Sequence, residues 1–137
     1  MPYIAQVACG KLPLLNVYGN DYNTKDGTGV RDYLHVMDLA EGHLAALQYL
    51  DKQTDNVEIF NLGTGIGYSV LEVISTFEEV NDLTINYMIT KRRAGDVAVC
   101  YADTAKAKEL LGWTAKRSLA DMCRDAYNWQ NRNPGGY

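Results

Sequence analysis

Three alternating glycines between residues 61 and 70 suggest a phosphate-binding turn. The stretch reads NLGTGIGYSV, follows an apolar run at residues 57–62 and precedes a plausible helix. Many dinucleotide sites begin with a strand, a glycine-rich turn and a helix, because glycine lets backbone amides approach a pyrophosphate. Here the spacing is GxGxG instead of GxGxxG, and the extended segment at residues 84–89 leads into KRR where a ribose-binding acid is expected. We therefore interpret the stretch as a tight strand-to-helix crossover that binds no NAD.

Tyr87 and Lys91 imitate the YxxxK catalytic pair of short-chain dehydrogenases. That pair requires a helix, on which side chains four positions apart share one face. The segment TINYMITK is rich in β-branched residues and predicts a strand, along which the two side chains would lie ~13 Å apart. We therefore regard the match as a coincidence.

The histidines and cysteines are not spaced as a catalytic or metal-binding cluster. His35 and His43 have no carboxylate or cysteine at the spacing of a triad or a zinc site, so we expect packing or surface roles. Cys9, Cys100 and Cys123 are an odd number without a CxxC pair. This usage predicts no metal site, no disulfide framework, and free thiols in a reducing cytoplasm.

Length and composition exclude several classes of function. The 137 residues fit one domain or one piece of a larger one, with 47% hydrophobic and 22% charged residues. No apolar run approaches the ~20 residues that span a membrane. A net charge of −4 provides no basic surface for binding nucleic acid by charge, whereas one small anion would need only local arginines.

The candidate residues are carried by alternating helical and extended segments. Acid-containing capping patterns predict helices that begin at Asp38, Ser69, Asp103 and Ser118, and the chain starts in a helix that ends at Gly10. Extended segments are expected at residues 14–18, 30–36, 57–62, 84–89 and 97–101. Residues 19–29, GNDYNTKDGTG, read as a loop in which aspartates form turns. The pattern predicts an α/β fold with mixed short strands and about four to five helices.

Two longer segments resemble a known enzyme family. Residues 16–43, NVYGNDYNTKDGTGVRDYLHVMDLAEGH, and residues 91–103, KRRAGDVAVCYAD, are similar to the carboxyl-terminal portion of the UDP-glucose 4-epimerases, which are extended short-chain dehydrogenase/reductases. NLGTGIGYSV, LGWTAK and the ending WQNRNPGGY are similar to that family as well. The resemblance implies that residues 1–137 form a single UDP-sugar-binding domain. The amino-terminal Rossmann half, with the NAD turn, the catalytic serine or threonine and the true YxxxK tyrosine, is missing.

The resemblance also implies how a UDP-sugar would be bound. Asn16, Val17 and Tyr18 would line the uracil, with the Tyr18 ring covering one face. Arg31 and Arg93 would hold the diphosphate, and Asp96 would accept hydrogen bonds from the ribose hydroxyls. General chemistry agrees, because guanidinium groups match phosphates and a carboxylate suits a vicinal diol. Without the family, the two arginines would read as ordinary surface residues.

Cys100 occupies a position that faces the hexose in the family, where either a bulky tyrosine or a small residue is found. A thiol leaves space that a phenol ring would fill, so this position would admit UDP-GlcNAc and UDP-GalNAc. The alternative is a small packing residue without influence on the substrate.

The resemblance implies an isomerase of galactose metabolism that interconverts UDP-glucose and UDP-galactose through hydride removal and return at C4 by NAD. In the complete enzyme this chain would supply the UDP-sugar anchor, whereas alone it would bind no NAD tightly and be inactive. We also expect it to expose an apolar face that meets the missing NAD-binding domain and otherwise favours self-association. Two alternatives remain open, namely a stand-alone UDP-sugar-binding module and a piece of another nucleotide-sugar decarboxylase or dehydratase.

Overall fold

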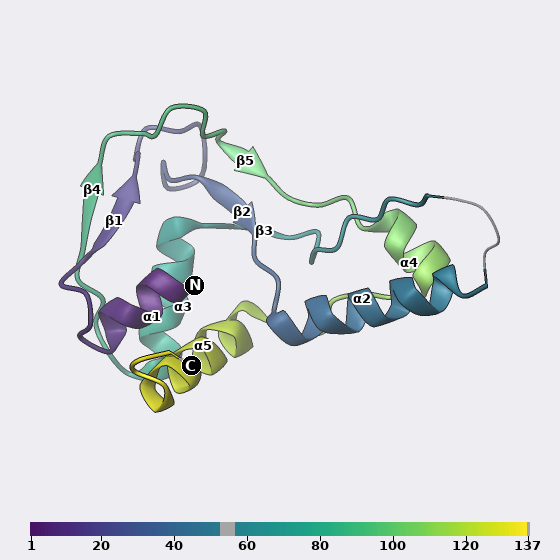
Figure 1. The fold of residues 1–137 in the computed structure, drawn as a ribbon. Coiled ribbons are helices and arrows are strands. Elements are labelled where there is room, and N and C mark those ends of the chain that lie inside the picture. Colours follow the sequence, from purple (N-terminus) through teal and green to yellow (C-terminus); the bar gives the residue numbers. More distant parts are fainter. Residues whose placement is uncertain (53–56, 137) are drawn as a thin grey trace.

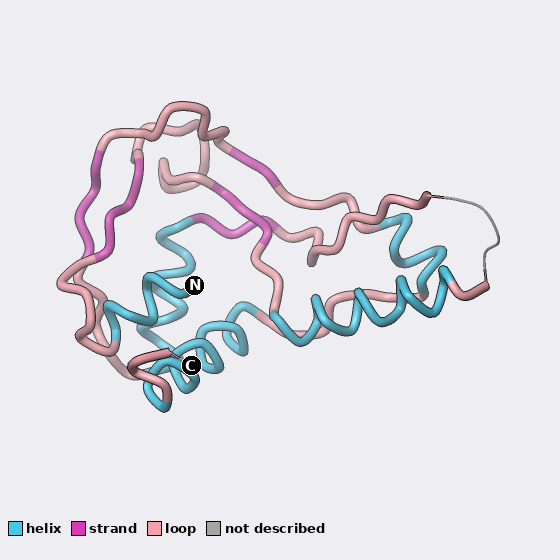
Figure 2. Tube along the Cα trace, in the orientation of Figure 1, coloured by secondary structure: helices cyan, strands magenta, loops and turns pink. Residues whose placement is uncertain are grey.

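An α/β body and a projecting helical arm make up the computed structural model, which describes residues 1–52 and 57–136 (Figures 1 and 2). The body contains both small sheets and three helices, and the arm contains two more. This arrangement confirms the expected fold class. The elements in chain order are α1 (Pro2–Ala8), β1 (Leu15–Tyr18), β2 (Val30–Asp32), α2 (Val36–Leu50), β3 (Gly67–Ser69), α3 (Val70–Asn81), β4 (Tyr87–Thr90), β5 (Val99–Cys100), α4 (Ala105–Leu111) and α5 (Leu119–Arg132).

Both sheets are short and join segments that are distant in the sequence. In the first sheet, β1 and β4 run parallel, with Leu15 opposite Tyr87. In the second sheet, β2 lies between β3, which is antiparallel to it, and β5, which is parallel to it. Arg31 stands at the centre of this sheet, opposite Tyr68 on one side and Cys100 on the other.

The core of the body lies where α1, α3 and α5 pack together behind β1. Phe77 on α3 and Cys123 on α5 are completely buried there, and Val17 of β1 joins them. The rings of Phe77 and Tyr127 meet edge to face with their centroids 6.2 Å apart, within the range of about 4.5–7 Å typical of aromatic pairs. Burial of the thiol raises the pKa of Cys123 to about 11, so it remains a neutral packing group.

The arm is formed by α2 and α4, which pack against each other away from the body (Figure 1). Trp113, just after α4, is buried against α2 and donates a hydrogen bond from its indole nitrogen to the carbonyl oxygen of Asp38 at 3.1 Å. Gly42 permits this close packing, because a Cβ atom there would lie 2.8 Å from Leu62 and 3.1 Å from Trp113. The other side of α2 leaves Leu44 and Leu47 more than half exposed.

Local capping signals located most helix ends correctly. Ser69 with Glu72 and Ser118 with Asp121 form the two expected capping boxes. The amide of Gly10 binds the Val7 carbonyl and the next amide binds that of Gln6, which is the Schellman ending expected for α1. At α4, Asp103 accepts from the amide of Ala105, although the N-cap position itself is Thr104.

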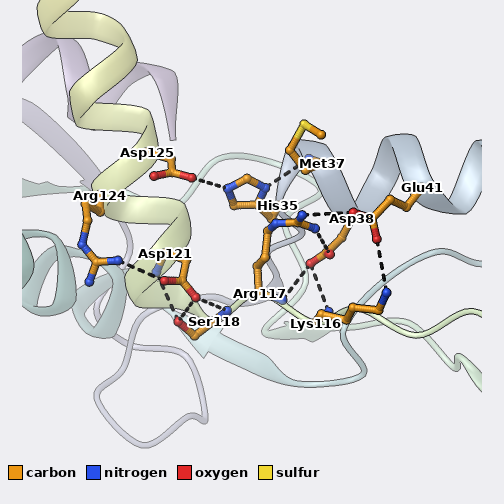
Figure 3. Close-up of polar contacts among 10 residues, drawn as sticks. All are labelled: His35, Met37, Asp38, Glu41, Lys116, Arg117, Ser118, Asp121, Arg124 and Asp125. Carbon is orange, nitrogen blue, oxygen red and sulfur yellow. Dashed lines mark hydrogen bonds and ion pairs between the residues drawn. The ribbon is translucent and has the colours of Figure 1, made fainter.

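The expected start of α2 was wrong. The helix begins at Val36, and its N-cap is His35, whose Nδ1 accepts a hydrogen bond from the Met37 amide at 3.1 Å. Asp38 is instead completely buried and binds the segment before α5 (Figure 3). Its carboxylate accepts from the amides of Lys116 and Arg117 at 3.2 and 3.0 Å and from the Arg117 guanidinium. This contact fixes the arm to the body.

Some expected strands were also wrong in extent. The apolar run at residues 57–62 forms no strand, and the extended stretch from Val30 stops at Asp32 instead of Val36. β3 lies at residues 67–69, inside the stretch interpreted as a crossover turn. In the ranges described, the fold contains no helix that is long and apolar enough to cross a membrane.

Candidate functional site

A cavity of about 370 Å³ lies between the two sheets and brings together most of the expected site residues. Five of the seven line it, from three separate parts of the chain. The cavity is lined by Tyr3, Leu15, Asn16, Tyr18, Tyr22, Gly29, Arg31, Tyr33, Val70, Arg93 and Asp96.

Asn16 and Tyr18 reach this cavity from β1, whereas Val17 does not. Successive side chains of a strand point to opposite faces. Val17 therefore turns away from its two neighbours into the body core, where only 1% of its surface is exposed. Its side chain cannot line a base in the cavity, which corrects the expectation for this residue.

Arg93 and Asp96 form one unit with Tyr18. The guanidinium carbon of Arg93 lies 4.6 Å from the centroid of the Tyr18 ring, a cation–π distance. Its Nε donates to Asp96 Oδ2 at 3.0 Å. Arg93 and Asp96 were expected to serve different parts of a ligand, and here they contact each other. The side chain of Arg93 is 62% exposed, so its terminal nitrogens remain accessible at the mouth of the cavity.

Arg31 supplies a second positive charge from the opposite wall. Its Nη1 donates to the Val30 carbonyl oxygen at 2.7 Å. No carboxylate forms an ion pair with it among residues 1–52 and 57–136. A half-buried guanidinium without a counter-charge attracts anions, and phosphate matches its fork of donors.

The aromatic lining of the cavity was not foreseen. Tyr3, Tyr22 and Tyr33 surround it together with Tyr18. Tyr22 is buried, with 6% of its surface exposed, and the guanidinium carbon of Arg92 lies 3.9 Å from the centroid of its ring. Within the described part of the chain, the hydroxyl of Tyr22 is buried without a hydrogen-bond partner. The sequence contains this tyrosine in GNDY, residues 19–22, but only the folded loop places its side chain beside β1.

The loop at residues 19–29 is held against α3 by Asp26. Its carboxylate accepts from the amide and hydroxyl of Thr28, at 2.9 and 2.7 Å, and from the hydroxyl of Ser69. Burial by itself would raise the pKa of Asp26, but the hydrogen bonds from Ser69 and Thr28 outweigh it and hold that pKa below its ordinary value. The aspartate thus forms a turn, as expected, and also fixes the loop that carries Tyr22 and Gly29.

Cys100 lies outside this cavity. It is exposed on β5 and lines a second, more open hollow of about 490 Å³ together with Phe60, Leu62 and Tyr101. Arg31 lines both hollows, and it is the strand partner of Cys100 in the second sheet. A ligand extending past Arg31 would therefore reach the thiol.

The glycine turn does not fit a dinucleotide pyrophosphate. The amides of Thr64 and Gly65, which would face such a group, donate to the carboxylate of Asp32 at 3.0 to 3.1 Å. An internal carboxylate occupies the position that a phosphate would take. Tyr87 lies on β4, as the strand interpretation of the YxxxK match requires.

The histidines have structural contacts. His35 is buried, and its Nε2 lies 3.1 Å from Asp125 Oδ2 while Nδ1 accepts from the Met37 amide (Figure 3). The ring proton therefore resides on Nε2 and points to Asp125. His43 binds the Leu39 carbonyl within α2 at 2.8 Å. No group of three potential metal ligands occurs in the residues that the structure describes.

Comparisons with known proteins agree with this geometry. The family model of GDP-mannose 4,6 dehydratase matches residues 1–126. The UDP-glucose 4-epimerase of Bacillus subtilis is 58% identical over 137 residues, and the chain spans 40% of that protein. The crystal structure of the Bifidobacterium longum UDP-glucose 4-epimerase with NAD+ and UDP aligns with a TM-score of 0.94 and 51% identity, over 99% of this chain and 40% of that one. A UDP-Glc/GlcNAc 4-epimerase from Campylobacter jejuni aligns with a TM-score of 0.84 and 40% identity, over 96% of this chain and 40% of that one.

Proposed function

Because this chain belongs to the GDP-mannose 4,6 dehydratase family, whose model matches residues 1–126, we propose that it is the UDP-sugar-binding part of a UDP-glucose 4-epimerase. The observation that carries the proposal is the single cavity lined by Asn16, Tyr18, Arg31, Arg93 and Asp96. It occurs in a fold whose Bifidobacterium relative holds UDP and NAD+. The whole enzyme would interconvert UDP-glucose and UDP-galactose.

Each lining residue has a role that its chemistry supports. Tyr18 offers its ring to the uracil, and Asn16 on the same strand face offers an amide that both donates and accepts. Arg31 and Arg93 bind the two phosphates from opposite walls. Asp96 accepts from ribose hydroxyls with the carboxylate oxygen that Arg93 leaves free. Val17 contributes through its backbone and its packing only.

We assign the hydride chemistry at C4 to NAD held by a part of the enzyme that lies outside this chain. The glycine turn here is occupied by Asp32, so this turn offers that cofactor no pyrophosphate site. Its own residues bind and orient the nucleotide, which restricts the hexose to the region near Arg31 and Cys100. The isolated chain is therefore inactive.

Cys100 extends the proposal to larger hexoses. It is exposed beside Arg31 in the open hollow, and a thiol is much smaller than a phenol ring. We propose that UDP-GlcNAc and UDP-GalNAc are accepted in addition to the unsubstituted sugars. The name of the Campylobacter relative includes such a substrate.

The exposed side of α2 completes the proposal, as the surface that contacts the NAD-binding part. We define the α2 face as Val36, Met37, Leu44 and Leu47, each at least half exposed. Apolar side chains gathered on one helix are a surface to be covered. In the isolated chain they would drive self-association.

The three free cysteines agree with a reducing compartment, the cytoplasm.

A chimera tests the proposed function against the alternatives. The chain replaces the matching residues of the Bacillus subtilis epimerase, and a coupled assay measures conversion of UDP-galactose to UDP-glucose. We expect turnover in the chimera and none in the isolated chain. UDP binding without turnover in the chimera would favour a separate binding module, and turnover in the isolated chain would contradict the proposal.

A further inference from the structure

The glycine-rich loop at residues 63–65 binds a carboxylate of its own chain. Asp32 Oδ1 accepts from the amide and the hydroxyl of Thr64, at 3.0 and 2.5 Å. Asp32 Oδ2 accepts from the amides of Gly65 and Ala102, at 3.0 and 3.2 Å. Every partner is a donor, so the arrangement suits an ionised carboxylate and matches the way concave backbone loops bind anions.

The glycines make this close approach possible. A Cβ atom on Gly63 would lie 2.4 Å from Asp32 Oδ2 and 2.6 Å from the Cβ of Ala102, so no larger residue fits between them. Gly65 has a φ of +73°, in the left-handed region that side chains disfavour. The features that suggested a phosphate site in the sequence therefore serve an internal anion.

Asp32 is directly connected to two residues of the proposed substrate site. It follows Arg31 on β2, and Ala102 lies two residues beyond Cys100 on β5. The backbone pairing of β2 with β5 has a register of only two residue pairs, Val30 with Val99 and Arg31 with Cys100. Such a short pairing is weak by itself. The bond from Ala102 to Asp32 continues it beyond the last pair.

We propose that Asp32 is a positioning residue for the substrate site. Its carboxylate is the resident anion of the loop at residues 63–65, and it holds Arg31 and Cys100 opposite each other by tying β2 to that loop and to Ala102. The consequence for Arg31 rests on the proposed UDP-binding function, whereas the placement of Cys100 does not.

Hydrogen exchange in the complete 137-residue chain tests the resident anion. In Asp32→Ala, the amides of Thr64, Gly65 and Ala102 should exchange about tenfold faster or more. Formate is small enough to enter the vacated space and should restore slow exchange. Asp32→Asn, which keeps the shape and serves if Asp32→Ala does not fold, should exchange faster and resist formate, because its amide fills the space without a charge.

Asp121→Ala provides the matched control. This carboxylate also accepts from a backbone amide and a hydroxyl, both of Ser118, but at the start of α5 (Figure 3). Its loss should leave exchange of the loop at residues 63–65 unchanged, with or without formate. The proposed resident anion would be overturned if these amides exchanged as slowly in Asp32→Ala as in the unsubstituted chain. It would also be overturned if formate changed their exchange equally in Asp32→Ala and Asp121→Ala.

Two further measurements test the positioning role. The alkylation rate of the Cys100 thiol should change at least severalfold in Asp32→Ala and return with formate, and so should UDP affinity measured by calorimetry. An unchanged alkylation rate would overturn the positioning role even where the exchange result stands. If the chimera binds no UDP, the proposed function fails, and the alkylation result still decides the role of Asp32.

Discussion

Arg93 lies over the ring of Tyr18, with its guanidinium carbon 4.6 Å from the ring centroid, and thereby joins the ends of β1 and β4 at one wall of the cavity. Tyr18 ends β1, whereas Arg93 follows β4, and the two strands pair in parallel. A cation over an exposed aromatic face contributes about 0.5–1 kcal/mol. The contact orients the guanidinium, while the side chain of Arg93 remains 62% exposed.

Removing either arginine of the cavity should weaken UDP binding about tenfold or more, because losing one partner of a charged hydrogen bond costs about 1.5–3 kcal/mol. We predict this for Arg31→Ala and Arg93→Ala, with calorimetry on the chimera as the measurement. Arg124→Ala is the control, since Arg124 pairs with Asp121 on α5. Unchanged affinity in both cavity variants would remove the arginines from the site.

Cys100→Tyr in the chimera should abolish turnover of UDP-GlcNAc and UDP-GalNAc while sparing UDP-glucose and UDP-galactose. A phenol ring would fill the space beside Arg31 in the open hollow, and pocket walls discriminate by such exclusion. Rates are compared for both pairs of sugars in the same assay. Cys100→Ser keeps the size of the side chain and should retain all four substrates. Equal rates on both pairs of sugars in Cys100→Tyr would show that Cys100 does not shape the pocket.

Charges placed on the α2 face should suppress self-association of the isolated chain. Leu44 and Leu47 are 56% and 60% exposed, and lysine near the end of a helix is compatible with its dipole. We predict that Leu44→Lys with Leu47→Lys lowers light scattering and binding of a hydrophobic dye. Met88→Lys, at a half-exposed position on β4, should change neither. A monomeric, dye-silent parent chain over a wide concentration range would contradict this prediction.

Acid should weaken the connection between the arm and the body through Asp38. Burial alone would raise the pKa of this carboxyl, but the hydrogen bonds from Arg117 and Lys116 outweigh burial and lower it below 3.8. The unfolded chain then binds the proton more readily than the folded chain. The stabilisation is therefore complete above about pH 4 and is lost as the pH falls through the lowered value.

Urea unfolding of Asp38→Asn measures this contribution. The variant should be less stable by about 1–3 kcal/mol at neutral pH, because its amide cannot serve the guanidinium and both backbone donors. The difference from the parent should shrink below the lowered pKa of Asp38. Asp51→Asn, at the exposed end of the same helix, should behave like the parent at every pH. A constant difference down to strongly acidic pH would exclude the proton linkage.

Features that depend on neighbouring residues were predicted well from the sequence. The boxes at Ser69 and Ser118 and the Gly10 ending need only a few adjacent side chains, so their patterns suffice. The alternation of β1 also contained the correct placement of Val17, since Asn16 and Tyr18 flank it and must share the opposite face. The family resemblance implied that all three residues line the base, whereas the side chains of only two of them can share that face.

Features that depend on residues far apart in the sequence could not be predicted from it. Asp38 has a capping pattern, but its carboxylate is buried and binds Arg117, 79 positions away. His35 therefore takes the N-cap position of α2. The apolar run at residues 57–62 resembled a strand, yet Val57 and Ile59 remain exposed without a strand to pair with in the described residues. The position of Cys100 outside the cavity likewise depends on how β2, β5 and the loops fold together, because its strand partner Arg31 does line the cavity.

The parallel pairing of β1 with β4 also determines when the cavity can form during synthesis. The Thr90 hydroxyl contacts the Val17 carbonyl oxygen, 73 residues earlier in the chain. At a ribosomal rate of roughly 5–20 residues per second, Tyr18 waits roughly 4–15 s before Arg93 is made. Closing so long a loop is entropically costly and slow. The nascent chain therefore has no complete cavity until β4, Arg93 and Asp96 have been translated, well after Tyr18 and Arg31.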